Sequence, residues 1–334
     1  MSRYAKLLSP CLVLLLLLSA CKQDAPVVPK NTHEATTSLQ LLPQTDAEWR
    51  YENLKIYPVT TDETLAETHS GLKNLKVLAE VIQTKEFRVT ERKQFGRTEN
   101  WYNSLTIQNR SQDTIFMMSG DVVTGGNQDR VIAYEQIVLP ATVKNIEVFC
   151  VEQGRSHYYD ANASAAEKKL AAFNGYYNVA GPAVRKAVQG GQQQEVWDAV
   201  SAVTSKNQAT SDTKTYAALD HETDQKKLRD AYLHFFEGKL AHQKNLVGLI
   251  AVCDGEIIGA DIFGHPNLFS KCSKALLHGY VAEAATRKPT KPTNQQKVQS
   301  VLDQLTALTA ETSNSNELAV KFSIGKQWVH LFAK

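Results

Sequence analysis

Two compact polar clusters, each containing glycine, interrupt the apolar runs between residues 120 and 157. The first cluster consists of Gly120, Asp121, Gly125, Gly126, Gln128, Asp129 and Arg130. The second cluster consists of Glu152, Gln153, Gly154, Arg155 and His157. A carboxylate beside an arginine can orient a water molecule or a hydroxylated substrate, or it can form a plain ion pair. If the intervening strands are neighbours in one sheet, both clusters lie at the same edge and form one polar site.

The first cluster combines backbone freedom with hydrogen-bonding side chains. Gly125 and Gly126 let the chain turn and approach a ligand closely. On an extended segment Gln128 and Arg130 point to one face and Asp129 to the other, so the first two are the better pair of ligand contacts. A solvated β-turn has the same composition and is the competing interpretation. The full set of candidate ligand-binding residues is Asp121, Gly125, Gly126, Gln128, Arg130, Glu152 and Arg155.

The second cluster follows an apolar run that ends at Cys150. Continued extension aligns Cys150 with Glu152, and Gly154 can break the alternation so that Arg155 faces Glu152. Glu152 is the candidate catalytic residue, as the group that would activate water. Cys150 with His157 suggests a nucleophile and its base, but a cysteine that ends an apolar strand is more commonly a small buried residue.

The N-terminus has the composition of a secretion signal. Residues 1–20 begin with basic residues and contain an apolar run at 11–18, which is too short to span a membrane. The following Leu-Ser-Ala-Cys resembles a bacterial lipoprotein signal, in which Cys21 is acylated, for example with palmitate, and becomes the mature N-terminus. An ordinary signal peptide with an incidental cysteine is the alternative. Residues 21–48 are polar, so we expect a flexible tether to the membrane.

Charge and cysteine content restrict the class of protein further. Loss of residues 1–20 removes two of the 37 Lys and Arg residues, which leaves the number equal to the 35 Asp and Glu residues. We do not expect a neutral chain to bind nucleic acid, because phosphate binding needs a concentrated positive field. Cys150, Cys253 and Cys272 allow one disulfide at most. No CxxC or HxxxH motif is present, so we expect neither a metal site nor a cofactor.

The chain before residue 156 is rich in short strand patterns. The alternating runs Leu105–Gln108 and Thr114–Met118 flank a turn composition and predict a hairpin. Further strands are predicted at 54–59, 87–90, 131–133, 135–139 and 143–151, and a short helix at 75–82. This spacing favours a sandwich or barrel-like sheet over a parallel core, and we predict an antiparallel, sandwich-like N-terminal half.

Beyond residue 157 helix and hairpin patterns alternate. Apolar spacing predicts helices at 192–203, 224–242, 268–285 and 294–309, and a partly helical segment at 161–173. Asp254-Gly255 predicts a hairpin of 246–253 with 256–262, because both turn positions tolerate positive φ. The chain closes with a predicted hairpin of 318–324 and 328–332, in which His330 is expected to be a hydrogen-bonded core residue. Residues 49–334 are thus predicted to be one integrated α+β domain, with a β-rich part at 49–156 packed against a mixed part at 157–334.

Several motifs resemble those of one protein family. They are Gly120-Asp121, Gly125–Arg130, Cys150–Arg155, Leu249–Phe263 and Val329–Leu331. Together they are similar to the ARG and Rhodanese-Phosphatase-superfamily-associated protein domain, over roughly residues 50 to 334. The resemblance implies a link to ADP-ribosylglycohydrolase-like and phosphatase-like proteins, and hence to nucleotide-derived metabolites. This chain departs from the family pattern with Ser156 for an aromatic residue, Asp129 for asparagine and Asn127 for a basic residue, which makes a phosphate ligand less suitable.

These patterns lead to one expected function and two alternatives. We expect a lipid-anchored protein of the bacterial cell envelope, periplasmic or at the cell surface, that binds a small polar ligand through both clusters. In the enzymatic alternative, Glu152 activates water to hydrolyse a nucleotide- or sugar-derived metabolite, while Arg130 or Arg155 holds an anionic group. In the structural alternative, both clusters serve the fold, and the lipoprotein forms complexes with partners that the sequence does not identify.

Overall fold

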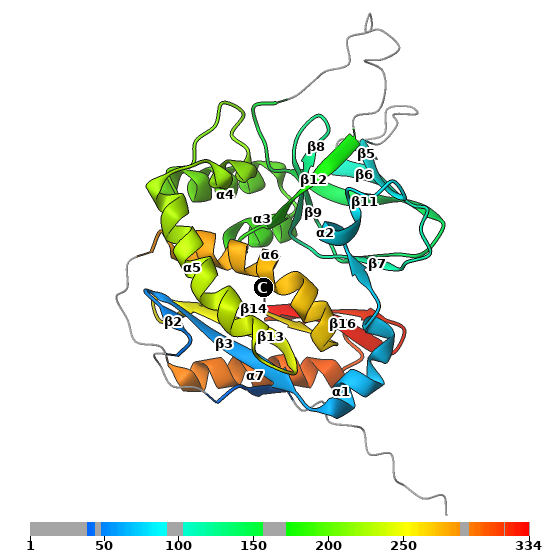
Figure 1. Cartoon of the computed structure of the whole chain (residues 1–334), viewed down its shortest axis with the longest axis vertical. Helices are drawn as coiled ribbons and strands as arrows, with labels where there is room; N and C mark the ends of the chain where they lie inside the picture. The colour runs from blue at the N-terminus through cyan, green and yellow to red at the C-terminus, as the bar shows by residue number, and fades with distance from the viewer. Residues whose placement is uncertain are drawn as a thin grey trace, which may run out of the picture. The chain divides into compact units, whose positions relative to one another are not determined.

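The computed structural model describes residues 39–43, 48–91, 103–155, 172–287, 294–316 and 318–333. The chain from Thr37 to Lys334 forms one compact unit, which is drawn in Figure 1. The predicted signal peptide, its acylation site Cys21 and the candidate base His157 lie outside the described residues. Residues 39–41, near the end of the predicted tether, form a paired strand. Within the described residues no helix is long and apolar enough to cross a membrane.

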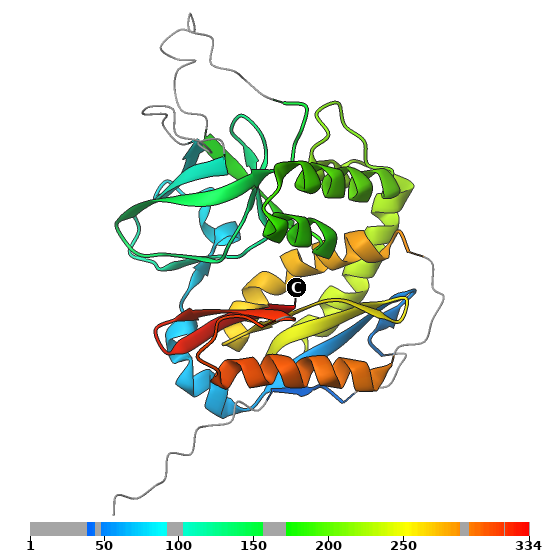
Figure 2. The ribbon, with the colours of Figure 1, turned by 180° about the vertical axis from the view of Figure 1, so that it is seen from behind.

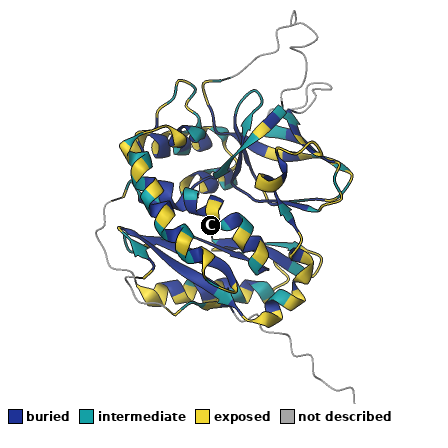
Figure 3. Cartoon of the chain, in the orientation of Figure 1, coloured by how far each residue is buried: buried dark blue, intermediate teal, exposed yellow. Residues whose placement is uncertain are grey.

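A seven-stranded antiparallel sheet forms one part of this unit. In order across the sheet its strands are β1 (Leu39–Leu41), β3 (Leu54–Thr61), β13 (Leu246–Cys253), β14 (Glu256–Phe263), β16 (Gln327–Ala333) and β15 (Ala319–Ile324), with β2 (Arg50–Tyr51) paired to β3. Strand β13 is buried at every position, as Figure 3 shows for most of the sheet. Because both faces are covered, this strand reads as a continuous apolar run rather than as an alternation.

Six other strands close into a barrel. In order around it they are β11 (Thr142–Cys150), β6 (Ser104–Asn109), β5 (Phe87–Glu91), β12 (Ala172–Val179), β8 (Asp121–Gly125) and β9 (Arg130–Ile132). Alternate side chains of a barrel strand point inward, and Val89, Ile107 and Val148 belong to the apolar cluster that fills this interior. A third sheet consists of β10 (Gln136–Val138), β7 (Ile115–Met117) and β4 (Lys76–Val77).

Helices cover the sheet and flank the barrel. They are α1 (Glu63–Thr68), α2 (Leu78–Val81), α3 (Pro182–Gly190), α4 (Gln193–Lys206), α5 (Asp224–Ala241), α6 (Pro266–Ala284) and α7 (Gln295–Ala310), with short 3-10 turns η1 (Ser70–Leu72) and η3 (Tyr216–Asp220). Helices α5 and α6 pack on one face of the large sheet and α7 on the other, which is clearest in Figure 2. Helices α3 and α4 pack against outward-facing residues of the barrel such as Val131.

The α+β class is confirmed, whereas the sandwich-like arrangement is not, because the strands of the β-rich part close into a barrel. The predicted hairpin of β6 with β7 is wrong: β6 pairs with β5 and β11, and β7 pairs with β10 and β4. The pattern at 75–82 divides into β4 and α2. The predicted helical segment at 161–173 ends in strand β12, and its residues 161–171 lie outside the described part of the chain.

The later helices and hairpins are confirmed. Helices α4, α5, α6 and α7 and the hairpins β13–β14 and β15–β16 appear within a few residues of their predicted bounds. Asp254 and Gly255 have φ values of 54° and 73°, the positive values that the short Asp-Gly hairpin turn requires.

Candidate functional site

Residues 125–130 of the first polar cluster and residues 152–155 of the second lie at one end of the barrel. Strands β5, β8 and β11 finish at this end, and β6, β9 and β12 begin there. The turn between β8 and β9 carries residues 125–130, and the chain that leaves β11 carries residues 151–155. Antiparallel closure therefore brings together two motifs that are more than 20 residues apart. We call the residues Glu91, Gly125 to Arg130, Cys150, Glu152 and Arg155 the barrel-end cluster.

Arg155 lies at the centre of the cluster, and its guanidinium forms hydrogen bonds with both motifs. Its Nε donates to both carboxylate oxygens of Glu152 at 3.0 Å, and its Nη2 donates to Glu152 Oε2 at 2.7 Å. The same Nη2 lies 3.0 Å from Asp129 Oδ1. Nη1 donates to the carbonyl of Gly126 at 2.9 Å, and Nη2 approaches that of Gly125 at 3.3 Å. One side chain thus fixes the β8–β9 turn against the segment after β11.

Further hydrogen bonds join the two motifs directly. The backbone N–H of Asp129 donates to Glu152 Oε2 at 2.9 Å, and Gln128 Nε2 donates to the Glu152 carbonyl at 2.7 Å. Asp129 Oδ1 accepts from the Gly125 N–H at 3.0 Å, and its Oδ2 accepts from Thr215 Oγ1 at 2.6 Å. Glu152 and Asp129 are 2% and 5% exposed. Their charges are therefore held almost entirely by protein groups rather than by water.

Arg130 faces the barrel interior, where it closes the apolar core with a polar layer. It shares the inward face of β9 with Ile132, and its side chain is 4% exposed. Nη1 donates to Gln128 Oε1 at 3.1 Å and to Cys150 Sγ at 2.7 Å, and Nη2 lies 3.6 Å from Glu91 Oε1. The Nε of Arg130 finds no hydrogen-bond partner among the described residues. Arg130 is therefore a buried guanidinium with one unpaired N–H, which is rare in folded proteins.

Gly126 is required by the packing of this turn. Its φ is +57°, and a Cβ at this position would lie 2.2 Å from Cζ of Phe173, on strand β12. Only glycine combines the left-handed backbone with this close approach of an aromatic ring. The second glycine of the predicted motif therefore serves the fold of the turn.

The environment shifts the pKa values of the cluster in opposite directions. Burial opposes ionisation of Glu152, but bonds from Arg155, Thr213 and the Asp129 N–H together lower its pKa. Burial raises the pKa of Asp129, which receives a single bond from Arg155 where Glu152 receives three. The hydrogen bonds that Arg155 donates to Glu152 raise the pKa of the Arg155 guanidinium. Glu152 and Arg155 thus form the firmly charged pair of the cluster.

This arrangement is poorly suited to acid–base or nucleophilic chemistry. A general base needs a free lone pair and a pKa near the working pH, whereas both oxygens of Glu152 are occupied and its pKa is lowered. Burial raises the pKa of the Cys150 thiol despite the nearby Arg130, so the nucleophile interpretation gains no support and the core interpretation of Cys150 fits its 4% exposure. Among the described residues no group of His, Cys, Asp or Glu could hold a metal ion.

Asp121 does not belong to this site. It lies at the opposite end of β8, fully buried, where Oδ2 accepts from the Met118 N–H at 2.7 Å and Oδ1 from the Tyr176 hydroxyl at 2.9 Å. Burial raises its pKa to about 7. Its place in the first cluster was predicted from closeness in sequence, but a strand of five residues carries its two ends to opposite rims of the barrel.

A second, deeper polar network connects elements of the barrel side with the large sheet. Arg185 on α3 makes two parallel bonds to Asp261 on β14, at 2.8 and 2.9 Å. Asp261 also contacts the Tyr280 hydroxyl and His330 Nε2, the latter at 3.0 Å, while His330 Nδ1 lies 3.3 Å from Glu135. His330 is 0% exposed, which confirms it as a hydrogen-bonded core residue.

Sequence reasoning missed several members of both networks. In the barrel-end cluster the missed residue is Glu91. The missed residues that bond to the cluster are Thr213, Thr215 and Gln193, whose amide bonds both backbone groups of Cys150 at 2.8 Å. They come from distant parts of the chain, and no local motif marks them. The sequence did indicate a partner for Asp261, since a lone carboxylate in the apolar run of β14 must be paired when it is buried. Nothing in the sequence identified Arg185 as that partner.

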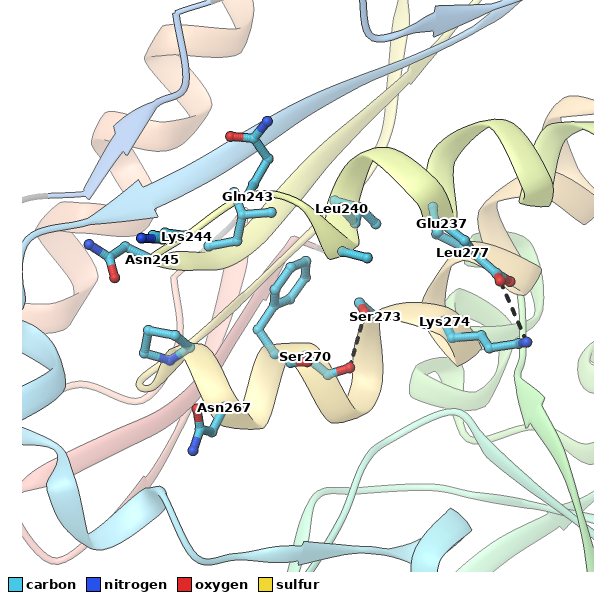
Figure 4. Close-up of a pocket in the computed structure, with 14 residues that line it drawn as sticks. Glu237, Leu240, Gln243, Lys244, Asn245, Asn267, Ser270, Ser273, Lys274 and Leu277 are labelled. Carbon is cyan, nitrogen blue, oxygen red and sulfur yellow. Dashed lines mark hydrogen bonds and ion pairs between the residues drawn. The ribbon is translucent and has the colours of Figure 1, made fainter.

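Two hollows of the surface lie away from both motifs. One is a groove beside α5 and α6, drawn in Figure 4. The other is a small recess around Arg229. Neither is lined by a residue of the barrel-end cluster, which instead presents a half-buried polar surface at residues 125–128 and Arg155.

Comparison with known proteins agrees with the motifs. The family model of the ARG and Rhodanese-Phosphatase-superfamily-associated Protein domain matches residues 43–331. This range includes both motifs of the barrel-end cluster as well as Arg185, Asp261 and His330. No curated protein and no solved structure matches the chain. Since the match covers most of its length, the chain belongs to the ARG and Rhodanese-Phosphatase-superfamily-associated Protein domain family.

Proposed function

We propose that this protein is a lipid-anchored protein of the bacterial cell envelope that binds a small, uncharged polar ligand at the barrel-end cluster. The proposal takes acylated Cys21 as the membrane anchor and the tether as a spacer that holds the domain in water. It takes the outer surface of the cluster, at Gly125 to Gln128 and Arg155, as the ligand contact. The domain lies on the periplasmic side or at the cell surface, and the membrane is its one proposed macromolecular partner.

The observation that supports binding most directly is the division of the cluster into a fixed inner layer and a half-exposed outer layer. The inner carboxylates hold Arg155 in one orientation, yet the Arg155 side chain is 28% exposed. Asn127 is half-buried beside it, and its side chain has no partner among the described residues. A polar surface whose groups are already oriented binds a ligand with little loss of conformational entropy.

The charge of the cluster supports an uncharged ligand over a phosphate. Three carboxylates, Glu91, Asp129 and Glu152, face two guanidinium groups, Arg130 and Arg155. The cluster therefore has an excess of one negative charge, and both arginines already have carboxylate partners. A phosphate would have to displace one of these partners, whereas hydroxyl and amide groups can use the remaining edges of Arg155 and Asn127.

The hydrogen bonds to Glu152 support binding over hydrolysis, because they leave this candidate base no free oxygen for a water molecule. These hydrogen bonds also support the structural alternative in part, since the inner layer serves the fold. The binding proposal and the structural alternative differ in what they require of the Asn127 side chain, because only the backbone N–H of Asn127 bonds to the inner layer, at Glu91.

A ligand screen on the full-length protein in detergent tests the proposal. Thermal shift with ribose, adenosine and adenosine monophosphate compares two neutral probes with a phosphorylated one. We expect a neutral probe to stabilise the protein more than the phosphate does, and Asn127→Ala to weaken that effect without lowering the melting temperature of the free protein. No stabilisation by any probe, together with a stoichiometric partner in pull-down from native membranes, would favour the structural alternative.

Anchoring is tested separately. Wild-type protein labelled with palmitate in a bacterial host is expected in the membrane fraction, and Cys21→Ser is expected to be unlabelled and released. Retention of unlabelled Cys21→Ser in the membrane would argue against acylation as the anchor.

A further inference from the structure

A groove of about 470 Å³ lies between the end of α5 and the beginning of α6. Its walls are the last turn of α5, the connecting residues 243–245 and the first three turns of α6, as Figure 4 shows. The volume falls in the range of small-molecule sites, roughly 300–1,000 Å³. None of its lining residues belongs to the barrel-end cluster, so the groove is independent of the function proposed above.

The lining combines an apolar floor with a polar rim. Leu240, Leu246, Phe269 and Leu277 are at most 8% exposed and form the floor. The rim carries three carboxamides and two hydroxyls, from Gln243, Asn245, Asn267, Ser270 and Ser273. In Figure 4 the 243–245 connection and α6 face each other across the groove, while the side chain of Gln243 points away from α6 and that of Asn267 points away from the connection, so each must rotate to reach a ligand in the groove. Such groups donate and accept hydrogen bonds, and they are the natural complement of adjacent hydroxyls.

The rim also carries an excess of positive charge. Lys274 pairs with Glu237 at 3.5 Å, and Glu237 is the one carboxylate of the lining. Lys244 forms no ion pair within the part of the chain that the structure describes, and it is exposed at the groove. The start of α6 and the end of α5 meet here, so their opposite helix dipoles largely cancel. The side chains therefore set the net charge of the groove at one positive unit.

We propose that this groove binds a small hydroxyl-rich acid, a sugar acid in chemical class. The amides and hydroxyls of the rim bind the ligand hydroxyls, Lys244 binds the carboxylate, and the Leu and Phe floor contacts the C–H face of the ring. A purely apolar acid would leave the amides of the rim unpaired, which is costly. A multiply charged phosphate would find a single unpaired cation among the described lining residues.

Calorimetric titration of the full-length protein in detergent with D-glucuronate, D-glucose and hexanoate tests this assignment. Glucuronate carries both features, whereas glucose lacks the charge and hexanoate lacks the hydroxyls. We expect glucuronate to bind most tightly, and Lys244→Ala to weaken it roughly tenfold, the effect of losing one charge-assisted hydrogen bond. Ser270→Trp, at an exposed helix position, fills the groove and is expected to abolish binding.

Two control variants separate this site from the barrel end. Ser201→Trp, at an exposed position of α4, is expected to bind glucuronate like the wild type, and so is Asn127→Ala. The proposal is overturned if glucuronate does not bind, if glucose or hexanoate binds equally well, or if binding survives both Ser270→Trp and Lys244→Ala. Loss of binding in Asn127→Ala alone would assign the sugar acid to the barrel end instead.

Discussion

Replacing Arg155 by alanine would remove the side chain that holds the two motifs together. The variant loses three bonds to Glu152, one to Asp129 and two to backbone carbonyls of the β8–β9 turn. It leaves two carboxylates that are at most 5% exposed without their cation. Removing one partner of a buried pair costs about 3–5 kcal/mol. Because Arg155 is 28% exposed, water replaces part of the loss, and we expect a decrease of roughly 2–4 kcal/mol in the free energy of unfolding.

Urea denaturation at pH 7, followed by circular dichroism, measures this decrease. Arg88→Ala is the matched control, since Arg88 is an exposed arginine on barrel strand β5, and surface substitutions change stability by less than about 0.5 kcal/mol. In a Glu152→Gln background, Arg155→Ala should cost at least ~1 kcal/mol less, because the shared interaction is already weakened.

The penalty should also depend on pH. The lowered pKa of Glu152 means that its contribution to stability is present above its ordinary value of 4.5 and is lost as the pH falls through the folded-state pKa. Without Arg155 this contribution disappears, so the difference between wild type and variant should shrink from pH 7 toward acid. An Arg155→Ala protein as stable as Arg88→Ala at pH 7 would refute the reasoning.

Urea denaturation of three further variants tests the packing of Gly126, the burial of Asp121 and the pairing of Asp261. Gly126→Ala should cost roughly 1–3 kcal/mol more than Gly325→Ala, because both have a φ near +57° but only the first places a Cβ against an aromatic ring; equal costs would contradict this. The pKa of Asp121, about 7, means that wild-type stability falls as the pH rises from about 4 to 7, by up to ~4 kcal/mol, and Asp121→Asn should flatten this dependence. Asp261→Asn should destabilise by about 3–5 kcal/mol, since it leaves Arg185 buried beside a neutral group; a loss below 1 kcal/mol would argue against the pair.

Periodicity predicted the helices well because each of them buries one face. In α7, for example, Val298, Leu302 and Leu305 recur at helical spacing and are all buried. The Asp-Gly turn fixed the β13–β14 hairpin in the same way, through a backbone requirement that acts within a few residues. These signals are local, so a single sequence carries them in full.

Strand partners were harder to predict because alternation shows that a strand has a buried face but not which strand lies beside it. Strand β6 alternates regularly, with buried Leu105, Ile107 and Asn109. This pattern fits a hairpin with β7 as well as the observed places between β5 and β11 in a closed barrel. The closing strand β12 lies beyond the part of the chain on which the sandwich prediction rested.

The site was predicted only in part, because alternation gives the face of each side chain but not the position of segments that are distant in sequence. Alternation correctly grouped Gln128 with Arg130, which share a hydrogen bond. It assigned Asp129 to the other face, and there Asp129 meets Arg155, from a segment whose path a single sequence does not determine. Asp121 was included because it is close in sequence, although it lies at the opposite end of its strand.

The most direct test of the central claim is calorimetric titration of the full-length protein with adenosine or ribose, whichever gives the larger thermal shift, in wild type, Asn127→Ala and Arg88→Ala. We expect equal affinity in wild type and Arg88→Ala, weaker binding by roughly tenfold in Asn127→Ala, and weaker binding of adenosine monophosphate than of adenosine. Equal affinity in all three proteins, or a preference for the phosphate, would contradict a neutral-ligand site at the end of the barrel.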